Sequence, residues 1–364
     1  MDPMSALAIV AIVVQFVDLG GRIIAKGREK QKHNRDRVAL LSEHSQTLSS
    51  LTTALYDAEI AYDSIYWVTG KPGAGKSTIM KHILQSPSLK VHLANWAGQR
   101  LFLVTLYYAW NAGETPQKLL RGLKQSLLYQ VLDQYPDFIP MVCPRRWAAF
   151  WLFGITPRAL EEDMHEWELE ECFDNLMEIS RTRIALAVFI DGLDEFDVPP
   201  HDVAALVESL ATTSQNGVKI CVASRPWVEF NDAYSDAPKL QMDLRTGSDM
   251  EIFVAERFQK CLALRELSAA LPEESINLQQ DLKQKANSVF IWLKLVVDAL
   301  ELAATEGSGI VELKEIIESL PTDICSLYDT IWDRTPERNR QRGAVLFKLS
   351  NQQISPSAGR LCGC

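Results

Sequence analysis

The chain has 364 residues, 47% of them hydrophobic and 23% charged, which is enough apolar material for a core of one or two domains. Its net charge of -10, with no Lys/Arg run interleaved with aromatic residues, excludes a general nucleic-acid-binding surface. Seven scattered cysteines without CxxC spacing favour reduced thiols in a cytoplasmic protein over a disulfide framework or a zinc site.

The first predicted element is an apolar helix that begins at Asp2 and Pro3, a capping acid followed by proline. Its apolar run of about 14 residues is shorter than the ~20 that span a bilayer. Basic residues follow between positions 22 and 37. Two interpretations stay open: a core helix of a small bundle with a solvated basic end, or a helix that contacts an anionic membrane surface or a partner. A helical stripe over residues 38–55 then predicts a packed linker helix.

A phosphate-binding loop is the most specific motif in the sequence. An apolar strand at residues 65–69 leads into a glycine-rich turn and then into a helix with apolar periodicity, the order that such a loop requires. The glycines let backbone N–H groups approach a polyphosphate, and the N-terminus of the helix adds its positive dipole end. Lys76 would reach the β- and γ-phosphates, and Ser77 would bind Mg²⁺. The predicted nucleotide-binding residues are Gly70, Lys71, Pro72, Gly73, Ala74, Gly75, Lys76, Ser77 and Thr78.

A strand at residues 101–110 and a helix at 116–132 are predicted next. Along the chain, one extra strand therefore separates the phosphate-loop strand from the acid-bearing strand at residues 184–190. Residues 140–167 contain three tryptophans, and we predict an insertion in which they anchor a local core, namely Trp147, Trp151 and Trp167.

Acidic residues follow the most apolar strand of the sequence. Residues 184–190 are continuously apolar, which predicts a strand of a parallel sheet buried on both faces. Ligands of open α/β sheets bind at the carboxyl ends of the strands. We therefore expect Asp191 to hold Mg²⁺ together with Ser77, and Asp194 or Glu195 to orient or deprotonate an attacking water.

A helix at residues 201–213 leads into another buried strand at 218–226. Ser224 and Arg225 at its end are expected over the nucleotide, where Arg225 would sense or stabilise the γ-phosphate.

The remainder of the sequence is predicted to be helical after one last strand at residues 239–244. Ser248 and Glu251 have the spacing of a capping box, which predicts a helix from there to about Phe258. Further helical patterns indicate a separate all-helical domain packed on the sheet, with helices at 278–285, 289–303, 310–320 and 325–332.

With these residues assembled, the sequence resembles NACHT-type members of the STAND group of P-loop NTPases, most of all those of filamentous fungi. Asn287-Ser288 stands where those proteins often carry a glycine. The first 27 residues are similar to the first helix of HeLo or HeLo-like cell-death effector domains, and we expect that effector region to be truncated here. The similarity covers about residues 63–335 and rests on Ile65-Tyr66-Trp67 before the loop, Asp191-Gly192-Leu193-Asp194-Glu195, Ala223-Ser224-Arg225-Pro226, Val289-Phe290-Ile291-Trp292, Leu320-Pro321 and Leu327-Tyr328.

The expected fold is α/β: a P-loop NTPase with a parallel sheet and flanking helices, followed by an all-helical domain and preceded by an N-terminal helical extension. The expected boundaries are 1–30 for the apolar helix with its basic end, 31–62 for the linker helix, 63–247 for the NACHT P-loop NTPase domain, 248–335 for the helical lid domain and 336–364 for a truncated tail.

The resemblance implies an ATP-binding signalling switch with ATP or ADP and Mg²⁺ as ligands, in which hydrolysis is slow and serves the switch. It also implies association with itself or with longer NACHT relatives and a cytoplasmic location, with membrane contact through the N-terminal helix in the active state. The implied role is in fungal non-self recognition, such as heterokaryon incompatibility, in innate immunity, or in programmed cell death. Two alternatives stay open: a turning-over ATPase or phosphotransferase that depends on Glu195, or a truncated fragment that regulates full-length relatives.

Overall fold

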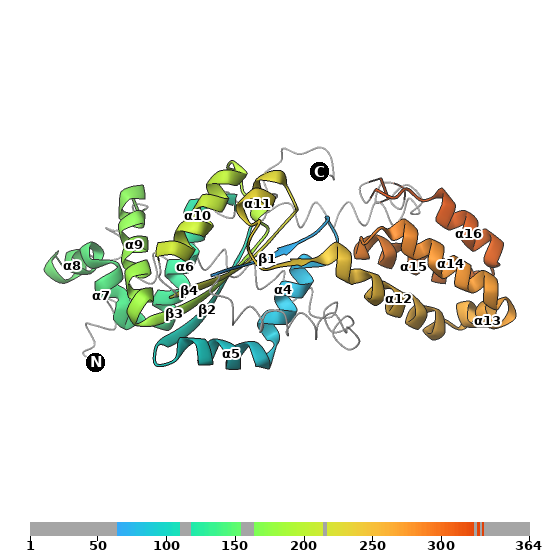
Figure 1. Ribbon diagram of the computed structural model, residues 1–364, viewed down its shortest axis with the longest axis horizontal. Helices are drawn as coiled ribbons and strands as arrows, with labels where there is room; N and C mark the ends of the chain where they lie inside the picture. Colours follow the sequence, from blue (N-terminus) through green and yellow to red (C-terminus); the bar gives the residue numbers. More distant parts are fainter. Residues whose placement is uncertain are drawn as a thin grey trace. The chain divides into compact units, whose positions relative to one another are not determined.

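The computed structural model describes residues 64–109, 118–153, 164–213, 217–323, 326, 327 and 330. Contacts between residues divide the chain into two compact units (Figure 1). Among the described residues, the sheet unit contains 64–69 and those of Lys76–Leu240, and the helical unit contains Gly70–Gly75 and those from Gln241 onward. The predicted N-terminal helix, linker helix and tail lie outside the described residues, as does nearly all of the predicted helix at 325–332.

The sheet unit contains a five-stranded sheet in the order β2-β3-β4-β1-β5. The pairs β1–β4, β3–β4 and β2–β3 are parallel, which confirms the predicted α/β class. The strands are β1 (Ile65–Thr69), β2 (Leu101–Tyr108), β3 (Ile184–Asp191), β4 (Val218–Ser224) and β5 (Lys239–Gln241). Every residue of β3 is buried, as its continuous apolar run predicts.

Along the chain, β2 comes between β1 and β3 as predicted, but the order of the strands in the sheet is different. β4 lies between them, whereas β2, which follows β1 in the chain, lies at the far edge of the sheet. Parallel strands are joined by long helical crossovers, so neighbours in sequence need not be neighbours in the sheet. The chain from β1 to β2 passes through two helices, α4 (Lys76–Gln85) and α5 (Pro87–Ala97).

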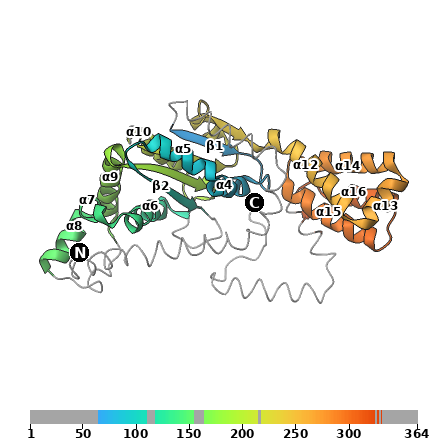
Figure 2. The ribbon, with the colours of Figure 1, turned by 90° about the horizontal axis from the view of Figure 1, so that it is seen from below.

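The two faces of the sheet are covered by different helices. Figure 1 shows α5 below the strands and α10 (Pro200–Thr213) above them, and Figure 2 shows α5 in front of the sheet when it is seen from below. Ile184, Leu186, Val188 and Ile190 of β3 belong to the main core on the α10 side. Successive side chains of a strand alternate between faces, so the intervening residues of β3 face α4 and α5.

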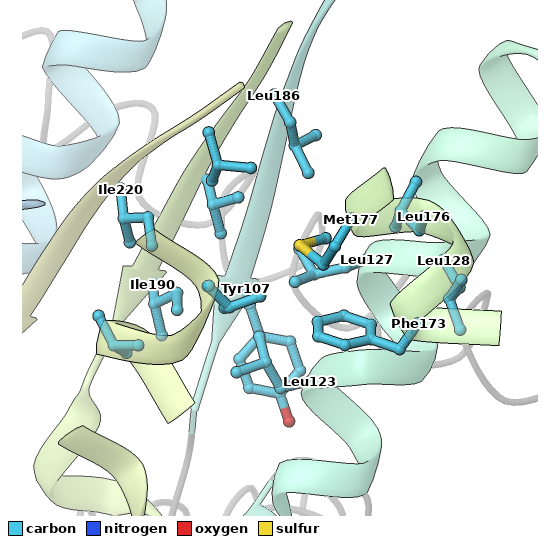
Figure 3. Packing of buried hydrophobic residues seen from close by; sticks show 14 of the residues in the cluster. Tyr107, Leu123, Leu127, Leu128, Phe173, Leu176, Met177, Leu186, Ile190 and Ile220 are labelled. Carbon is cyan, nitrogen blue, oxygen red and sulfur yellow. The ribbon is translucent and has the colours of Figure 1, made fainter. Parts of the chain in front are cut away.

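The main core lies between the sheet and the helices α6 (Leu120–Gln134), α9 (Glu166–Thr182) and α10. Figure 3 shows that the core side chains of α6 and α9 meet beside those of the strands. The buried residues of α9 recur at helical spacing, which gives this helix one apolar stripe. The labelled residues are Tyr107, Leu123, Leu127, Leu128, Phe173, Leu176, Met177, Leu186, Ile190 and Ile220.

The tryptophan prediction for residues 140–167 is wrong for two of the three residues. Trp147, in α8 (Pro144–Phe153), packs against the main core, but Trp151 is 50% exposed and Trp167 is 56% exposed. Trp167 instead stacks on the ring of His165, and the guanidinium of Arg145 lies over it at 5.2 Å from the ring centroid. Tryptophan content alone does not show which rings face a core, because the ring can also cover surface residues. The short elements before α8 are η3 (Pro136–Phe138) and α7 (Ile139–Val142).

The predicted start of the first helix after the sheet is also wrong. β5 ends at Gln241, and α12 (Met242–Lys260) begins at once, so Ser248 and Glu251 lie within this helix and not at its cap. Asp243 in the first turn favours this earlier start because it complements the helix dipole. A short helix, α11 (Val228–Ala233), precedes β5.

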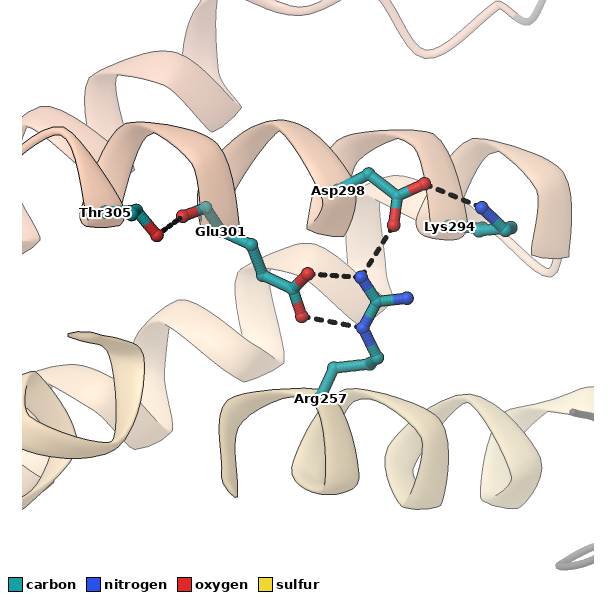
Figure 4. A network of polar contacts seen from close by, with 5 residues as sticks. All are labelled: Arg257, Lys294, Asp298, Glu301 and Thr305. Atoms are coloured by element: carbon teal, nitrogen blue, oxygen red, sulfur yellow. Dashed lines mark hydrogen bonds and ion pairs between the residues drawn. The ribbon is translucent and has the colours of Figure 1, made fainter. Parts of the chain in front are cut away.

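Apart from Gln241, the last residue of β5, the described residues of the helical unit form helices and no strand, as predicted. Besides α12 these are α13 (Leu262–Ala270), α14 (Pro272–Ala286), α15 (Phe290–Thr305) and α16 (Ile310–Ser319), which share a second core. Figure 4 shows that Arg257 of α12 pairs with both Glu301 and Asp298 of α15. None of the helices in the described residues is long and apolar enough to span a membrane.

Candidate functional site

The glycine-rich loop between β1 and α4 contains a tight turn. The N–H of Ala74 donates to the carbonyl of Lys71 over 3.2 Å, with Pro72 and Gly73 in between. Gly73 has a φ of 76°. Proline followed by a residue of positive φ is typical of a type II turn, and only glycine adopts this conformation readily. Gly75 also has a positive φ, of 96°, so the loop needs glycine at two of the three positions that the motif supplies.

The loop leads directly into the first turn of α4. Lys76, Ser77 and Thr78 form this turn, and each is half-buried. The first turn has no acidic residue. The positive end of the helix dipole therefore favours an anion at this end of α4.

Asp191 ends β3 on the face of the sheet that α4 covers. Its side chain is almost fully buried, and its register partners are Tyr108 of β2 and Ala223 of β4. The Nζ of Lys81 in α4 lies 5.5 Å from the centroid of the Tyr108 ring, which places this ring under α4. Burial and the nearby charge of Asp191 raise the pKa of the Tyr108 phenol, so that it stays protonated. Asp191 and Ser77 thus belong to one layer of the sheet unit.

The turn after β3 brings Asp194 and Arg225 together. Gly192, with a φ of 89°, donates its N–H to the carbonyl of Ala223 over 2.9 Å and starts a short turn, η5 (Leu193–Glu195). One oxygen of Asp194 then accepts the backbone N–H of Arg225, and the other lies 3.0 Å from its Nε. The side chain of Asp194 is 6% exposed, so this pair is largely shielded from solvent. Two of the three predicted catalytic side chains therefore hold each other.

Glu195 and Ser224 occupy different environments. Glu195, at the end of η5, is half-buried. The hydroxyl of Ser224 accepts the indole N–H of Trp67 over 2.9 Å and donates to the carbonyl of Arg225. Since it binds the tryptophan of β1, the Ser224 hydroxyl ties the two central strands together, whereas the sequence had suggested a place over a nucleotide.

Several residues that contact the loop were not predicted from the sequence. Within the helical unit, the N–H of Lys71 donates to an oxygen of Asp243 over 3.3 Å. The Nζ of Lys71 donates to the side-chain oxygen of Asn287 over 2.9 Å and to its carbonyl over 3.3 Å. The N–H of Ile291 donates to the carbonyl of Gly73 over 3.3 Å. Of these residues, the sequence analysis had singled out only Asn287, as part of the Asn287-Ser288 pair that stands where the proteins it resembles often carry a glycine.

The donor types of the two predicted Mg²⁺ ligands, Ser77 at the start of α4 and Asp191 at the end of β3, are those that Mg²⁺ takes. Among the residues that the structure describes, no group of three or more His, Cys, Asp and Glu side chains could hold a metal ion. Mg²⁺ does not need such a cluster, because it keeps several waters and takes one or two carboxylates, hydroxyls or substrate phosphates. Ser77 and Asp191 offer one hydroxyl and one carboxylate of this kind.

Comparison with known proteins gives a family match over the loop and the acidic strand. The model of the family described as "Nephrocystin 3, N-terminal" matches residues 43–225, just over half of the chain. No curated protein matches the sequence.

Two solved structures show weak similarity. A structure of Drosophila ORC bound to DNA has 14% sequence identity and a TM-score of 0.35, covering 86% of this chain and 68% of that chain. A structure of C. elegans PCH-2 has 10% identity and a TM-score of 0.36, covering 81% of this chain and 72% of that chain. Similarity of this size does not bear on function.

Proposed function

The chain belongs to the nephrocystin 3 N-terminal family, and from this and the geometry of its glycine-rich loop we propose that it is a nucleotide-binding switch of the P-loop class. In this proposal ATP and ADP favour different conformations because they make different contacts, and the protein signals through that difference.

The observation that carries the proposal is the loop itself. Two glycines with positive φ turn the backbone directly into an α4 whose first turn has no acid and contains Lys76 and Ser77. This arrangement supplies N–H groups, a helix dipole and an ammonium group to a polyphosphate. We propose that residues 70–78 bind the phosphates in this way.

We assign the metal to the hydroxyl of Ser77 and the carboxylate of Asp191. Bound Mg²⁺ would neutralise the phosphate charge at this position. The position of Asp191 at the carboxyl end of β3, on the face of the sheet that α4 covers, supports the assignment.

Glu195 is our choice for the residue that orients or deprotonates an attacking water. Asp194 was the other predicted acid, but it is engaged by Arg225 through two contacts. Arg225 can contact a γ-phosphate through its Nε only after that atom leaves Asp194. We therefore propose that hydrolysis is slow and that Arg225 changes partner between nucleotide states.

The biological role that we propose follows the resemblance to fungal NACHT proteins. It includes nucleotide-dependent self-association or association with longer NACHT relatives, in non-self recognition or programmed cell death. We also propose a cytoplasmic location, with membrane contact through the apolar N-terminal segment in the active state.

The first test measures binding of a fluorescent ATP analogue with Mg²⁺ to the wild type, Lys76→Ala and Asp191→Asn. We expect both variants to lose most of the binding, whereas Lys90→Ala, which removes an exposed lysine from α5, should bind like the wild type. Equal binding by the wild type and Lys76→Ala would contradict the proposed site.

The second test records particle mass and phosphate release in ATP and in ADP. A switch predicts a larger particle in ATP than in ADP, together with slow turnover. Rapid turnover by a monomer would instead favour the alternative of an ATPase or phosphotransferase that depends on Glu195.

A further inference from the structure

The tip of the glycine-rich loop is held by the helical unit at both sides of its turn. Lys71 at the start of the turn is bound through its backbone N–H to Asp243 and through its Nζ to Asn287. On the other side, Gly73 accepts the N–H of Ile291. Asp243 lies in the first turn of α12, and the other two residues lie at the junction between α14 and α15.

The side chains of Ile291 and Val289 pack closely against Gly73. A Cβ placed on Gly73 would lie 2.5 Å from the Cγ2 of Ile291 and 3.1 Å from the Cγ1 of Val289. Real Cβ atoms do not approach other atoms to 2.5 Å, so a side chain at this position would force Ile291 or the loop to shift. The glycine therefore permits both the turn and the contact.

The α14–α15 junction has two successive residues in the left-handed backbone conformation, the first of which caps α14. Asn287 and Ser288 have φ values of 45° and 66°, and they are the only non-glycine residues with positive φ in the described part of the chain. Such residues persist where the surroundings hold them, and they cluster at ligand sites and switch regions. Ser288 donates its hydroxyl to the carbonyl of Asp243 over 3.0 Å, which ties the junction to the other residue that binds Lys71.

We propose that Asp243 and Asn287 are positioning residues for the phosphate-binding loop. With Ser288 and Ile291 they form a loop clamp, which fixes the turn at Lys71 and Gly73 in the conformation that binds phosphate. The inference rests on the proposed function, and it adds that nucleotide affinity depends on the attachment of the loop to the helical unit.

The expected change in nucleotide affinity depends on the fraction of molecules in which the loop has the conformation that binds phosphate. If the binding conformation is only partly populated, the apparent dissociation constant rises by the inverse of that fraction. Loss of one hydrogen bond from the clamp is expected to raise the apparent dissociation constant roughly twofold to tenfold, the range of a typical hydrogen bond in a protein.

The experiment compares Asp243→Ala and Asn287→Ala with the wild type in the full-length chain, with two readouts. Amide hydrogen exchange without nucleotide should become faster in peptides that cover residues 70–75. The dissociation constant of the fluorescent ATP analogue with Mg²⁺ should rise as stated above.

Two further variants separate positioning from general destabilisation. Asp243→Asn keeps an oxygen that can accept the N–H of Lys71, and we expect it to restore most of the affinity. Glu251→Ala removes another acid from α12, one that pairs with Lys283 and does not contact the loop, and it should behave like the wild type in both readouts.

A double-mutant cycle tests the contact of Lys71 with Asn287 directly. Lys71→Met removes the ammonium group and keeps the backbone N–H. If the contact positions the loop, Asn287→Ala should weaken binding much less in the Lys71→Met background than in the wild type. Full additivity would show that Asn287 acts by another route and would overturn its assigned role.

The outcomes separate the two proposals. If the wild type binds no nucleotide, the proposed function fails, and the clamp's effect on affinity fails with it. If the wild type binds but Asp243→Ala and Asn287→Ala bind equally well, or bind less without faster exchange of the loop, only the clamp is overturned.

Discussion

At the scale of single residues, Asp194 illustrates how an acid near a nucleotide motif can have a structural partner. It accepts the N–H of Arg225 and pairs with its side chain, and so fixes the chain where β4 ends. A buried N–H that loses its acceptor costs about 1–3 kcal/mol. The carboxylate therefore contributes to stability whether or not nucleotide is bound.

We predict that Asp194→Ala lowers the free energy of unfolding by about 1–3 kcal/mol, because it leaves the N–H of Arg225 without this acceptor. Urea denaturation followed by circular dichroism measures the change. Asp197→Ala, at an exposed position shortly after the same turn, should change stability by less than about 0.5 kcal/mol. Equal effects of the two variants would count against the role of Asp194.

Gly73 has both a positive φ and close neighbours, whereas Gly307 has a positive φ alone. Gly307 has a φ of 101° and open space around it, whereas Gly73 has a φ of 76° and Ile291 in contact range of a Cβ. We predict that Gly307→Ala costs about 1–2 kcal/mol from its backbone conformation alone. Gly73→Ala should cost more and also abolish binding of the ATP analogue. Thermal unfolding and the binding assay check this, and normal binding by Gly73→Ala would contradict it.

At the scale of elements, α12 and α15 are joined by the ion pairs in Figure 4. Arg257 pairs with Glu301 and with Asp298, and Lys294 also pairs with Asp298 at 2.6 Å. These hydrogen bonds raise the pKa of the Arg257 guanidinium, which favours the charged form. Since Arg257 is about three-quarters buried, its pairs are screened less than pairs at an open surface.

We predict that Arg257→Met lowers the stability of the helical unit by about 1–2 kcal/mol, because it leaves two carboxylates close together without the guanidinium. The matched control is Lys260→Met in the last turn of the same helix, whose pair with Glu256 is exposed and should matter little. Hydrogen exchange of α12 and α15 peptides reports the loss. No difference between the two variants would mean that the network is dispensable.

The sequence predicted those elements whose pattern is local. The glycine-rich loop and the apolar β3 with its acids are continuous stretches, and most helices of the helical unit follow from periodicity. Asp243 and Asn287 could not be predicted as partners of Lys71, because they lie 172 and 216 positions away in the chain. The exposure of Trp151 and the place of β4 between β1 and β3 depend in the same way on long-range packing.

At the scale of the whole molecule, the chain of the loop belongs to one unit by its contacts and continues at both ends into the other. Its ends continue into β1 and α4 of the sheet unit, but its own contacts group Gly70–Gly75 with the helical unit. Thermodynamic linkage is reciprocal, so a clamp that favours nucleotide binding must itself be strengthened by nucleotide.

We therefore predict that the ATP analogue with Mg²⁺ slows amide exchange not only in the loop but also in peptides that cover residues 242–246 and 286–291. Hydrogen exchange with and without the analogue measures this, and Lys76→Ala serves as the control that shows no such change. Protection confined to residues 70–78 would mean that the nucleotide acts on the loop without acting on the clamp.

The double attachment of the loop has a consequence for reading sequence variation in this protein. Asp243 and Asn287 hold Lys71, and Ile291 holds Gly73, through hydrogen bonds from residues far away in the chain. On the proposed function, a substitution at one of these three positions would therefore impair a switch whose phosphate-binding motif is intact.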